Sequence, residues 1–275
     1  LPMGAAIWST PEAKILQFPT KSFLHFFDNH RLLQLKRPRW RTVTGGSKNY
    51  VVKLAADLEG RIALKTPVLS VTSITNGVMV ETPRGAERFD AIVMAAHSDQ
   101  ILNALANPSP EQRNMLSAVQ YGANEAYLHH DESLMPRRRQ AWGAWNYMKN
   151  APGQPACVTY WMNPLQGLPD DKPVFVTLNP PVAPDPSKTF GRFNYDHPLF
   201  DQAALEAQRG FHAIQGQGGI WLAGAWMGYG FHEDGIASGL RVAQALGGEI
   251  PWPCSFERLE QIERNGQLES LLEAA

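Results

Sequence analysis

The order of apolar and polar residues between 220 and 246 predicts a strand, a glycine-rich loop and a helix. The apolar run 220–223 has the length and composition of a buried strand, and Gly224 interrupts it. The helix after the loop has small residues in its first turns: Ala237, Ser238 and Gly239. Such a unit offers backbone N–H groups and the positive end of a helix dipole to an anionic group. The alternative is an ordinary crossover, capped by Asp234, that binds no ligand.

Periodicity along the rest of the chain predicts further short elements. Helices are predicted at 20–33, 50–58, 110–119 and 202–214. Strands are predicted at 62–65, 68–74, 77–81, 88–94, 126–129, 141–148, 157–162 and 174–178. Ser47 is the expected N-cap of the second helix, and terminal helices are expected at 256–263 and 267–272. The prolines and strands between about 98 and 215 predict a second domain with an antiparallel sheet and long loops.

Composition places the chain among soluble globular proteins, since 44% of its 275 residues are hydrophobic and 19% are charged. The formal net charge is −1, which argues against a nucleic-acid or anionic-membrane partner. The one basic cluster, Arg137-Arg138-Arg139, is interpreted as a solvated or substrate-facing patch. No apolar run reaches the roughly 18 residues that cross a bilayer, and the first residues lack the pattern of a signal peptide.

The residues that often bind metals or form disulfides match no known framework here. Cys157 and Cys254 are far apart in the sequence, so free thiols and a cytoplasmic location are expected. Histidine and acidic residues adjoin at 129–131 and 232–234, but neither run has the spacing of a metal site, and no metal is expected. No arrangement of Ser, His and Asp or of Cys and His indicates a hydrolase.

Residues Ala223-Gly224, Glu233 and Ser238-Gly239 follow one another across the predicted strand, loop and helix. This order resembles the closing FAD-contact segment of the flavin amine oxidases and of their relatives, the phytoene desaturases and protoporphyrinogen oxidases. The form GYGFHEDGIASG is most similar to a bacterial branch of amine-oxidase-like proteins that are expected to bind NAD or FAD. Residues 43–96 resemble the family too, with a Gly-Gly turn, a helix, the Pro67-Val68 step, a hairpin and a strand that ends in small residues.

The resemblance implies an α/β (α+β) fold that combines two domains. One is a partial FAD-binding domain of the glutathione-reductase type, and the other is an amine-oxidase-like substrate domain of antiparallel sheet and helices. The expected order is a substrate-domain segment (1–42), an FAD-domain segment (43–97), the substrate domain (98–217), the closing FAD-domain segment (218–248) and a C-terminal helical tail (249–275). Proteins of this family begin with a strand–GxGxxG–helix unit, which this chain lacks. The chain is therefore expected to be the C-terminal part of a longer protein, with the missing N-terminal part as its partner.

The resemblance also implies which residues contact the cofactor. In the family, the backbone at the position of Val68 faces the adenine of FAD; a buried strand valine is the alternative. The helix start is expected to direct its dipole toward the flavin ring, and Gly224 to let the loop close over the ribityl chain. The implied cofactor-binding positions are Val68, Ala95, Gly224, Phe231, His232, Glu233, Asp234 and Ser238. Ala225 replaces the acidic residue that holds a ribityl hydroxyl in many flavoproteins, so that contact is absent or made otherwise.

Aromatic residues are the candidates on the substrate side, because amine oxidases wall their substrate cavity with aromatic rings. They are Trp142, Trp145, Tyr147, Tyr160 and Trp161. Alternation places Trp145 and Tyr147 on one face and Tyr160 and Met162 on another. Packing in the sheet core is the alternative for each. Asn146 and Asn163 lie in apolar strands and are candidates to orient the substrate.

The sequence therefore predicts an FAD-dependent oxidoreductase, a flavoprotein that transfers a hydride from its substrate to the flavin. The substrate is expected to be a small molecule, either an amine or an apolar, unsaturated compound. The candidates for catalysis are Trp145, Tyr147, Tyr160 and His232, the last as a proton donor, with helix capping or packing as its alternative. Two other functions stay open: a truncated, non-catalytic module that cannot hold FAD, and a dehydrogenase that uses NAD alone.

Overall fold

The computed structural model describes residues 1–33, 41–151, 153–250 and 252. The chain forms two compact units: unit 1 contains Leu1–Thr66 and Gln120–Gln202, and unit 2 contains Pro67–Val119 and Ala203–Ala275. The terminal helices expected at 256–263 and 267–272 and the expected free thiol of Cys254 lie outside the described residues. The five expected domain segments stay predictions. In the ranges that the structure describes, no helix is both long and apolar enough to cross a bilayer.

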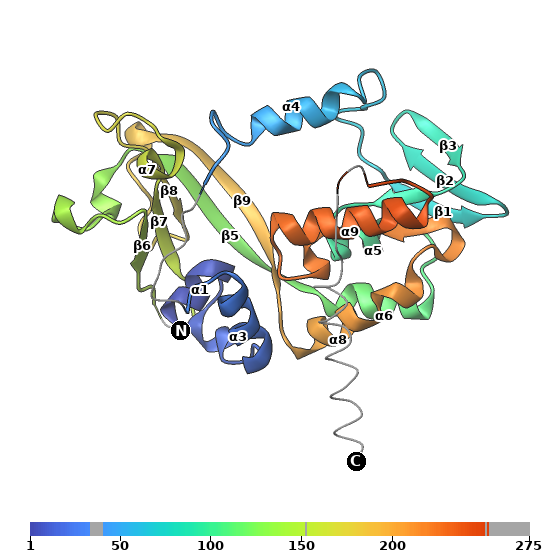
Figure 1. Cartoon of the computed structure of the whole chain (residues 1–275), viewed down its shortest axis with the longest axis horizontal. Coiled ribbons are helices and arrows are strands. Elements are labelled where there is room, and N and C mark those ends of the chain that lie inside the picture. The colour runs from blue at the N-terminus through green and yellow to red at the C-terminus, as the bar shows by residue number, and fades with distance from the viewer. Residues whose placement is uncertain (34–40, 152, 251, 253–275) are drawn as a thin grey trace, which may run out of the picture. The chain divides into compact units, whose positions relative to one another are not determined.

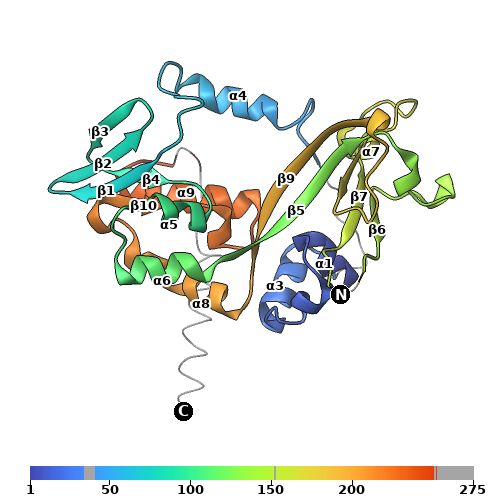
Figure 2. The same ribbon diagram turned by 180° about the vertical axis from the view of Figure 1, so that it is seen from behind.

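Unit 1 is built on a five-stranded sheet in which all neighbouring strands are antiparallel. The strand order is β6 (Trp145–Met148), β7 (Cys157–Trp161), β8 (Phe175–Leu178), β5 (Gln120–His129) and β9 (Thr189–Leu199). This confirms the antiparallel sheet expected between 98 and 215. The long strands β5 and β9 run side by side in both views (Figure 1 and Figure 2). The sequence did not predict β9, because this edge strand contains glycine, proline and charged residues and is mostly exposed.

The helices of unit 1 are α1 (Pro2–Trp8), α2 (Glu12–Ile15), α3 (Thr20–Asn29), α4 (Lys48–Ala56) and α7 (Met162–Gln166). Aromatic side chains form the core around the first three. The ring centroids of Trp8 and Phe26 are 4.6 Å apart, and Phe18 meets Phe200, just after β9, edge-on at 6.3 Å. Each such ring pair adds about 0.5–1.5 kcal/mol beyond the burial of its area, so the aromatic residues near the N-terminus are explained by packing.

Unit 2 contains two small sheets. The strands β1 (Ser70–Ile74), β2 (Gly77–Thr82) and β3 (Gly85–Phe89) form an antiparallel meander, and β4 (Ile92–Met94) pairs in parallel with β10 (Ile220–Leu222). The helices are α5 (Ser98–Ala104), α6 (Pro110–Ala118), α8 (Gln202–Gly210) and α9 (His232–Ala245). The turn at Asn76-Gly77 has a positive φ at both residues, a backbone conformation that favours Asn and Gly. Buried apolar side chains from both sheets and the helices form the core: Val71, Val78, Ile101, Leu116 and Leu222.

Short 3-10 turns connect many of these elements. They are η1 (Glu132–Leu134), η2 (Arg139–Ala141), η3 (Pro186–Lys188), η4 (Phe211–Ile214), η5 (Gln217–Gly219) and η6 (Ala225–Met227). Two of them correct predicted boundaries. The predicted strand 141–148 begins only at Trp145, after η2, and the predicted helix 202–214 ends at Gly210, where η4 takes over.

Two further local predictions are wrong. No strand forms at 62–65, where Lys65 has a φ of 53° that a strand does not allow. The predicted strand 88–94 is two strands, β3 and β4, which belong to different sheets. Ser47 is the N-cap of α4, as predicted, although its backbone angles are helical and its side chain makes no capping hydrogen bond. Whether an element forms, and where it stops, depends on tertiary contacts as well as on local pattern.

Candidate functional site

The carboxyl ends of the two parallel strands in unit 2 lie together. Leu222 is paired with Met94, and the N–H of Ala223 donates to the carbonyl of Met94 at 3.2 Å. The next residues, Ala95 and Gly224, therefore leave the sheet at the same edge, and Ala95 is exposed. In open α/β sheets, ligands bind outside the carboxyl ends of parallel strands. This edge and the start of α9 are called the carboxyl corner below.

Trp226 anchors the loop of the carboxyl corner. Its indole Nε1 donates to the carbonyl of Ala96 at 2.9 Å, and its ring lies edge-on to Phe211 at 4.9 Å. A Cβ atom on Gly224 would lie 2.2 Å from that Nε1. Only glycine therefore fits at position 224 while Trp226 keeps this place. The sequence assigned Gly224 to the ribityl chain, and that role stays a prediction.

Gln208 of α8 holds the same loop from the other side. Its Nε2 donates to the carbonyl of Trp226 at 2.9 Å and to the carbonyl of Gly228 at 2.7 Å. Both carbonyls belong to the same turn, so a single side-chain amide fixes the path of its backbone. Sequence reasoning missed Gln208, because nothing in a polar residue on a surface helix indicates a contact with a loop 18 to 20 residues away.

Asp234 fixes the beginning of α9, but it is not the N-cap. The helix starts at His232, and the carboxylate of Asp234 reaches back to accept the N–H of Phe231 at 2.9 Å. A Cβ atom on Gly228 would lie 2.4 Å from Oδ1 of Asp234, so the carboxylate packs tightly against the loop. Burial and the charge of Asp234 together raise the pKa of the Tyr229 phenol. Asp234 thus closes the loop onto the helix.

Ser238 joins the loop to the second turn of α9. Its buried hydroxyl accepts the N–H of Gly224 at 2.9 Å and donates to the carbonyl of Gly235 at 2.7 Å. A Cβ atom on Gly239 would meet nothing within 4 Å, and one on Gly235 would meet only Ala225 at 3.8 Å. The glycine side of the helix is therefore open, and small residues leave room there for a group to approach the backbone.

His232 and Glu233 occupy the exposed first turn of α9. Backbone N–H groups in a first turn have no carbonyl one turn earlier to bond with. They point along the helix axis with the positive end of its dipole, which suits an electron-rich group. The structure thus brings six predicted positions into one corner: Ala95, Gly224, Phe231, His232, Glu233 and Asp234. Ser238 lies behind them as a support.

Val68 lies elsewhere in unit 2, just before β1. It is 43% exposed and outside the strand, so the alternative of a buried strand valine is wrong. Pairing with β2 begins at the next residue, where the N–H of Leu69 donates to the carbonyl of Glu81 at 2.8 Å. Among the described residues, no hydrogen bond engages the backbone of Val68, which leaves its N–H and C=O accessible.

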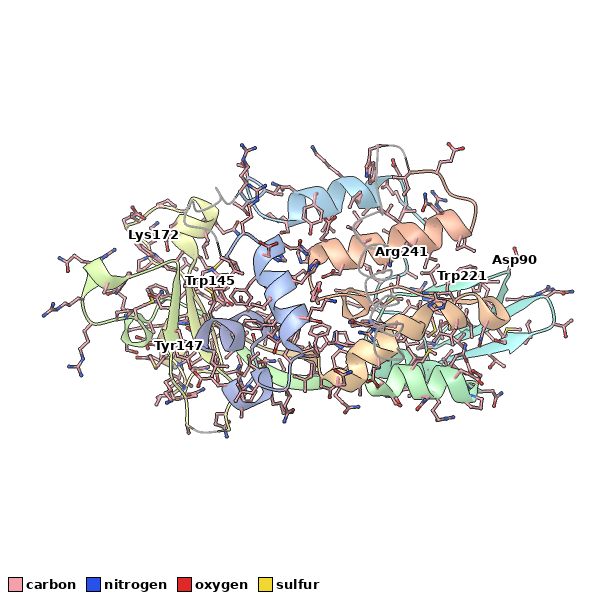
Figure 3. All side chains as sticks on the ribbon, turned by 60° about the horizontal axis from the view of Figure 1, so that its bottom comes forward. Asp90, Trp145, Tyr147, Lys172, Trp221 and Arg241 are labelled. Atoms are coloured by element: carbon pink, nitrogen blue, oxygen red, sulfur yellow. The ribbon has the colours of Figure 1, made fainter. Side chains whose placement is uncertain are left out.

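The sheet of unit 1 brings Trp145 and Tyr160 together. They are directly opposite each other on β6 and β7, and their rings meet edge-on at 5.2 Å. Opposite residues share a face of a sheet, so the prediction that Tyr160 lies on a different face from Trp145 and Tyr147 is wrong. Met162 starts α7 and is not part of the strand. Alternation gives the two faces of one strand, whereas the match between strands depends on register. Figure 3 labels Trp145 and Tyr147 on β6.

The other aromatic candidates pack within the sheet unit. Trp142 contacts Trp161 edge-on at 5.3 Å and Phe175 at 5.6 Å. Its Nε1 donates to the carbonyl of Pro136 at 2.8 Å. Tyr147 donates its hydroxyl hydrogen to Glu12 of α2 at 2.8 Å. The contacts of Trp142 and Trp161 are those of the sheet-core alternative.

Both asparagine candidates are occupied by the protein backbone. Asn163 is buried; its amide donates to the carbonyls of Pro169 and Lys172, and its Oδ1 accepts the N–H of Val174. Asn146 bonds to the backbone of Gly143: its Oδ1 accepts the N–H, and its Nδ2 donates to the carbonyl. Such side chains organise loops, and their hydrogen-bonding groups are already used.

His129 is fully buried in a hydrogen-bonded chain that crosses the sheet. The N–H of Asp131 donates to its Nδ1 at 3.1 Å, which assigns the proton to Nε2, the donor to Oγ1 of Thr177 at 2.7 Å. Thr177 and Thr159 share the next hydrogen bond, at 2.8 Å, and Thr159 donates to the carbonyl of Leu134. Burial lowers the pKa of His129. Within the described residues, no three His, Cys, Asp or Glu side chains gather where a metal could bind.

A hollow of about 470 Å³ lies beside the middle of β5 and the end of β8 in unit 1. Amide side chains line it and bond to one another: Asn179 donates to Asn124 at 2.7 Å, and Asn150 donates to the carbonyl of Asn179 at 2.8 Å. These contacts stabilise the turn where β8 ends.

A family model described as flavin containing amine oxidoreductase matches residues 18–173, more than half of the chain. This match confirms the resemblance inferred from the sequence and the flavin cofactor, FAD, that it implied. The matched range ends before 220–246, the segment on which the resemblance rested most. No curated protein matches the sequence.

Two solved structures show the same fold at low sequence identity. A CLA-producing fatty acid isomerase from P. acnes has a TM-score of 0.53 and 13% identity, over 73% of this chain and 52% of that one. Putrescine oxidase with bound putrescine has a TM-score of 0.53 and 12% identity, over 74% of this chain and 53% of that one. The chain therefore spans about half the length of these structures, and the likeness confirms the predicted mixed fold of helices and sheets.

Proposed function

Because the chain belongs to the flavin containing amine oxidoreductase family, we propose that it forms part of an FAD-dependent oxidoreductase. When bound, the flavin accepts a hydride from the substrate. The observation that carries the proposal is the carboxyl corner of unit 2. There a tightly anchored loop and an open, glycine-lined helix start follow the ends of two parallel strands.

The residues of the carboxyl corner fit a flat ring that gains negative charge when it is reduced. The N–H groups of His232 and Glu233 and the dipole of α9 favour negative charge near them. The open side at Gly239 leaves space next to the backbone. The loop is already held by protein contacts through Asp234 and Ser238, so these two side chains position the site and do not need the cofactor to order them. The exposed backbone of Val68 is a second point of contact for the cofactor.

The parallel sheet of unit 2 supports the proposal that the chain is completed by an N-terminal part. Parallel sheets in proteins are covered on both faces and rarely have only two strands. The outer edge of β10 is closed, because Gln215 accepts the N–H of Leu222 and donates to its carbonyl, both at 2.8 Å. The other edge belongs to β4, where Val93 is 44% exposed. A further strand would pair there, and the missing N-terminal part would supply it.

Helix α4 in unit 1 points to the same conclusion. None of its residues is buried, although it contains Val51, Val52 and Leu54. Large apolar side chains at this density on a helix need a covering partner. A truncated, non-catalytic module that cannot hold FAD remains the alternative for the 275 residues by themselves. Binding of NAD(P) and a cytoplasmic location stay predictions of the sequence.

The similarity to solved structures does not decide the chemical class of the substrate. One similar structure is named for a fatty acid and the other for putrescine, at equal TM-scores. Both an amine and an apolar, unsaturated compound are therefore consistent with the fold. Trp145, Tyr147 and Tyr160 on the sheet of unit 1 are the proposed substrate-side residues, and His232 at the start of α9 is a candidate proton donor.

Absorption spectroscopy tests this function. The purified chain is measured alone and together with the N-terminal part of its parent protein. We expect visible flavin bands in the combined sample, which bleach when substrate is added without oxygen. Bands in neither sample would overturn the flavin assignment, and nicotinamide-dependent turnover without them would favour the dehydrogenase. Equal bands in the chain alone would overturn the need for a completing strand.

A further inference from the structure

One row of side chains crosses the whole sheet of unit 1. The strand register aligns one residue from each strand, in the order Trp145, Tyr160, Val176, Leu128 and Gly191. Directly opposite residues share a face, so these five positions lie on one face and are called the apolar row. Four strand spacings of about 4.8 Å give the row a length of roughly 19 Å.

The apolar row is only partly covered. Trp145 at one end is 52% exposed, and the other four residues are half-buried. The neighbouring row on the same face differs: Val158, Leu178 and Ala126 in its middle are all buried. The apolar row is therefore a partly exposed strip beside a covered core.

Phe193 extends the strip at the β9 end. Its side chain is 46% exposed, and a Cβ atom on Gly191 would lie 2.8 Å from its Cζ. The ring thus lies over the space that glycine leaves open. Trp145 and Tyr160 give the strip aromatic rings at the β6 end and Phe193 gives it one at the β9 end, with Val176 and Leu128 between them.

Neither row carries a charge. The ten aligned positions are Trp145, Tyr160, Val176, Leu128, Gly191, Tyr147, Val158, Leu178, Ala126 and Phe193. The charged side chains of the same strands are on the opposite face, where Arg192 pairs with Glu125. Glu12 of α2 reaches this face at Tyr147 of the neighbouring row, whose hydroxyl donates to it. The aligned residues themselves offer no carboxylate, so an ammonium group bound along the apolar row would lose water without a charged partner there, which is unfavourable.

We propose that the apolar row binds an extended, uncharged hydrocarbon chain, and that the substrate is of this apolar class and not a diamine or polyamine. This inference rests on the function proposed above and narrows its substrate. The reasons are the length of the strip, its rings at both ends and the lack of charge among its aligned side chains. A chain that lies across the strands removes apolar surface from water at every position it touches, which favours binding.

Binding measurements on the full chain test the proposal. The probe is the methyl ester of cis-parinaric acid, an uncharged polyene whose fluorescence rises when it leaves water. The competitor is 1,4-diaminobutane. Trp145→Glu and Phe193→Glu place a charge at either end of the strip, on the two edge strands. Val182→Glu is the control, because Val182 is 71% exposed in unit 1 and lies outside the strands.

We expect Trp145→Glu and Phe193→Glu each to weaken probe binding by about tenfold or more, with Val182→Glu unchanged and no displacement by the diamine. Displacement by the diamine, or equal affinity in all variants, would overturn the proposal. So would self-association of the wild type that Trp145→Glu abolishes, because a second copy would then cover the strip. Flavin absorption is recorded on the same samples with the N-terminal part added. Loss of the flavin bands with probe binding intact would count against the proposed function alone.

Discussion

The hydroxyl of Ser238 accepts the backbone N–H of Gly224 at 2.9 Å, across 14 residues of loop and helix. The same hydroxyl donates to the carbonyl of Gly235, so one buried atom has both of its roles filled. Without this hydroxyl, the half-buried N–H of Gly224 loses its acceptor. An unsatisfied donor shielded from water destabilises a protein by about 1–3 kcal/mol. The loop and the start of α9 are therefore coupled through Ser238.

Ser238→Ala is expected to lower the free energy of unfolding by about 1–3 kcal/mol. Urea denaturation followed by circular dichroism measures the change. Ser117→Ala is the control, since Ser117 is exposed and its hydroxyl bonds to Asn114 within the same helix; a change within about 0.5 kcal/mol is expected there. Equal effects of the two substitutions would show that the Ser238 bridge does not stabilise the loop.

Gly224→Ala and Gly239→Ala are expected to act in opposite directions. The added Cβ at 224 would lie 2.2 Å from the Trp226 ring nitrogen, so the ring or the backbone must move. Overpacking of this kind destabilises by about 1–3 kcal/mol. At 239 the added Cβ meets nothing within 4 Å inside a helix, where alanine stabilises by roughly 0.5–1 kcal/mol relative to glycine.

Thermal unfolding and the near-ultraviolet circular dichroism of tryptophan measure both variants. A lower melting temperature and an altered tryptophan signal are expected for Gly224→Ala only. An unchanged Gly224→Ala spectrum would mean that Trp226 does not pack against residue 224 in solution.

His129 is expected to make stability depend on pH. Burial lowers its pKa below the usual value of about 6.5, so the unfolded chain binds a proton more readily than the folded one. Its contribution is therefore present above about pH 6.5 and is lost as the pH falls through the lower, folded pKa. The free energy of unfolding, measured by urea titration between pH 7.5 and about pH 5, should decrease as the solution becomes acidic.

His129→Gln removes the titrating group and is expected to flatten this part of the profile. A slope near pH 6 that survives in this variant would contradict the assignment to His129.

Asp131 is expected to affect stability at lower pH. Burial works to raise the pKa of its carboxylate, but hydrogen bonds from Asp185, Ser133 and Lys188 outweigh burial and bring the pKa to about 2. Its contribution is thus lost only between about pH 4 and pH 2.

The local pattern of the sequence was sufficient for the strand, loop and helix between 220 and 246, and β10, η6 and α9 lie where they were expected. The local pattern was insufficient for contacts between residues that are far apart in the sequence. Nothing in the pattern indicated that Gln208 would hold the loop, or that Trp145 and Tyr160 would be opposite each other. Register and loop contacts arise when segments far apart in sequence pack together, and periodicity within one segment does not contain them.

The edge strand β9 is a second element that local pattern did not predict. Its outward residues include Arg192 and Asp196 among aromatic ones, so no clean alternation is visible in the sequence. Pairing with β5 nevertheless holds ten residues of it in register. Val68 illustrates an error of propensity. The pattern favours a buried strand valine, and the structure exposes it instead.

The most direct test of the flavin assignment is the amount of FAD that copurifies with the completed protein when Gly239→Leu fills the open side of α9. Ala245→Leu, at an exposed position near the other end of the same helix, is the matched control. If the carboxyl corner binds the cofactor, the FAD content should fall by about tenfold or more in Gly239→Leu and stay unchanged in Ala245→Leu. The same FAD content in both variants would contradict the account.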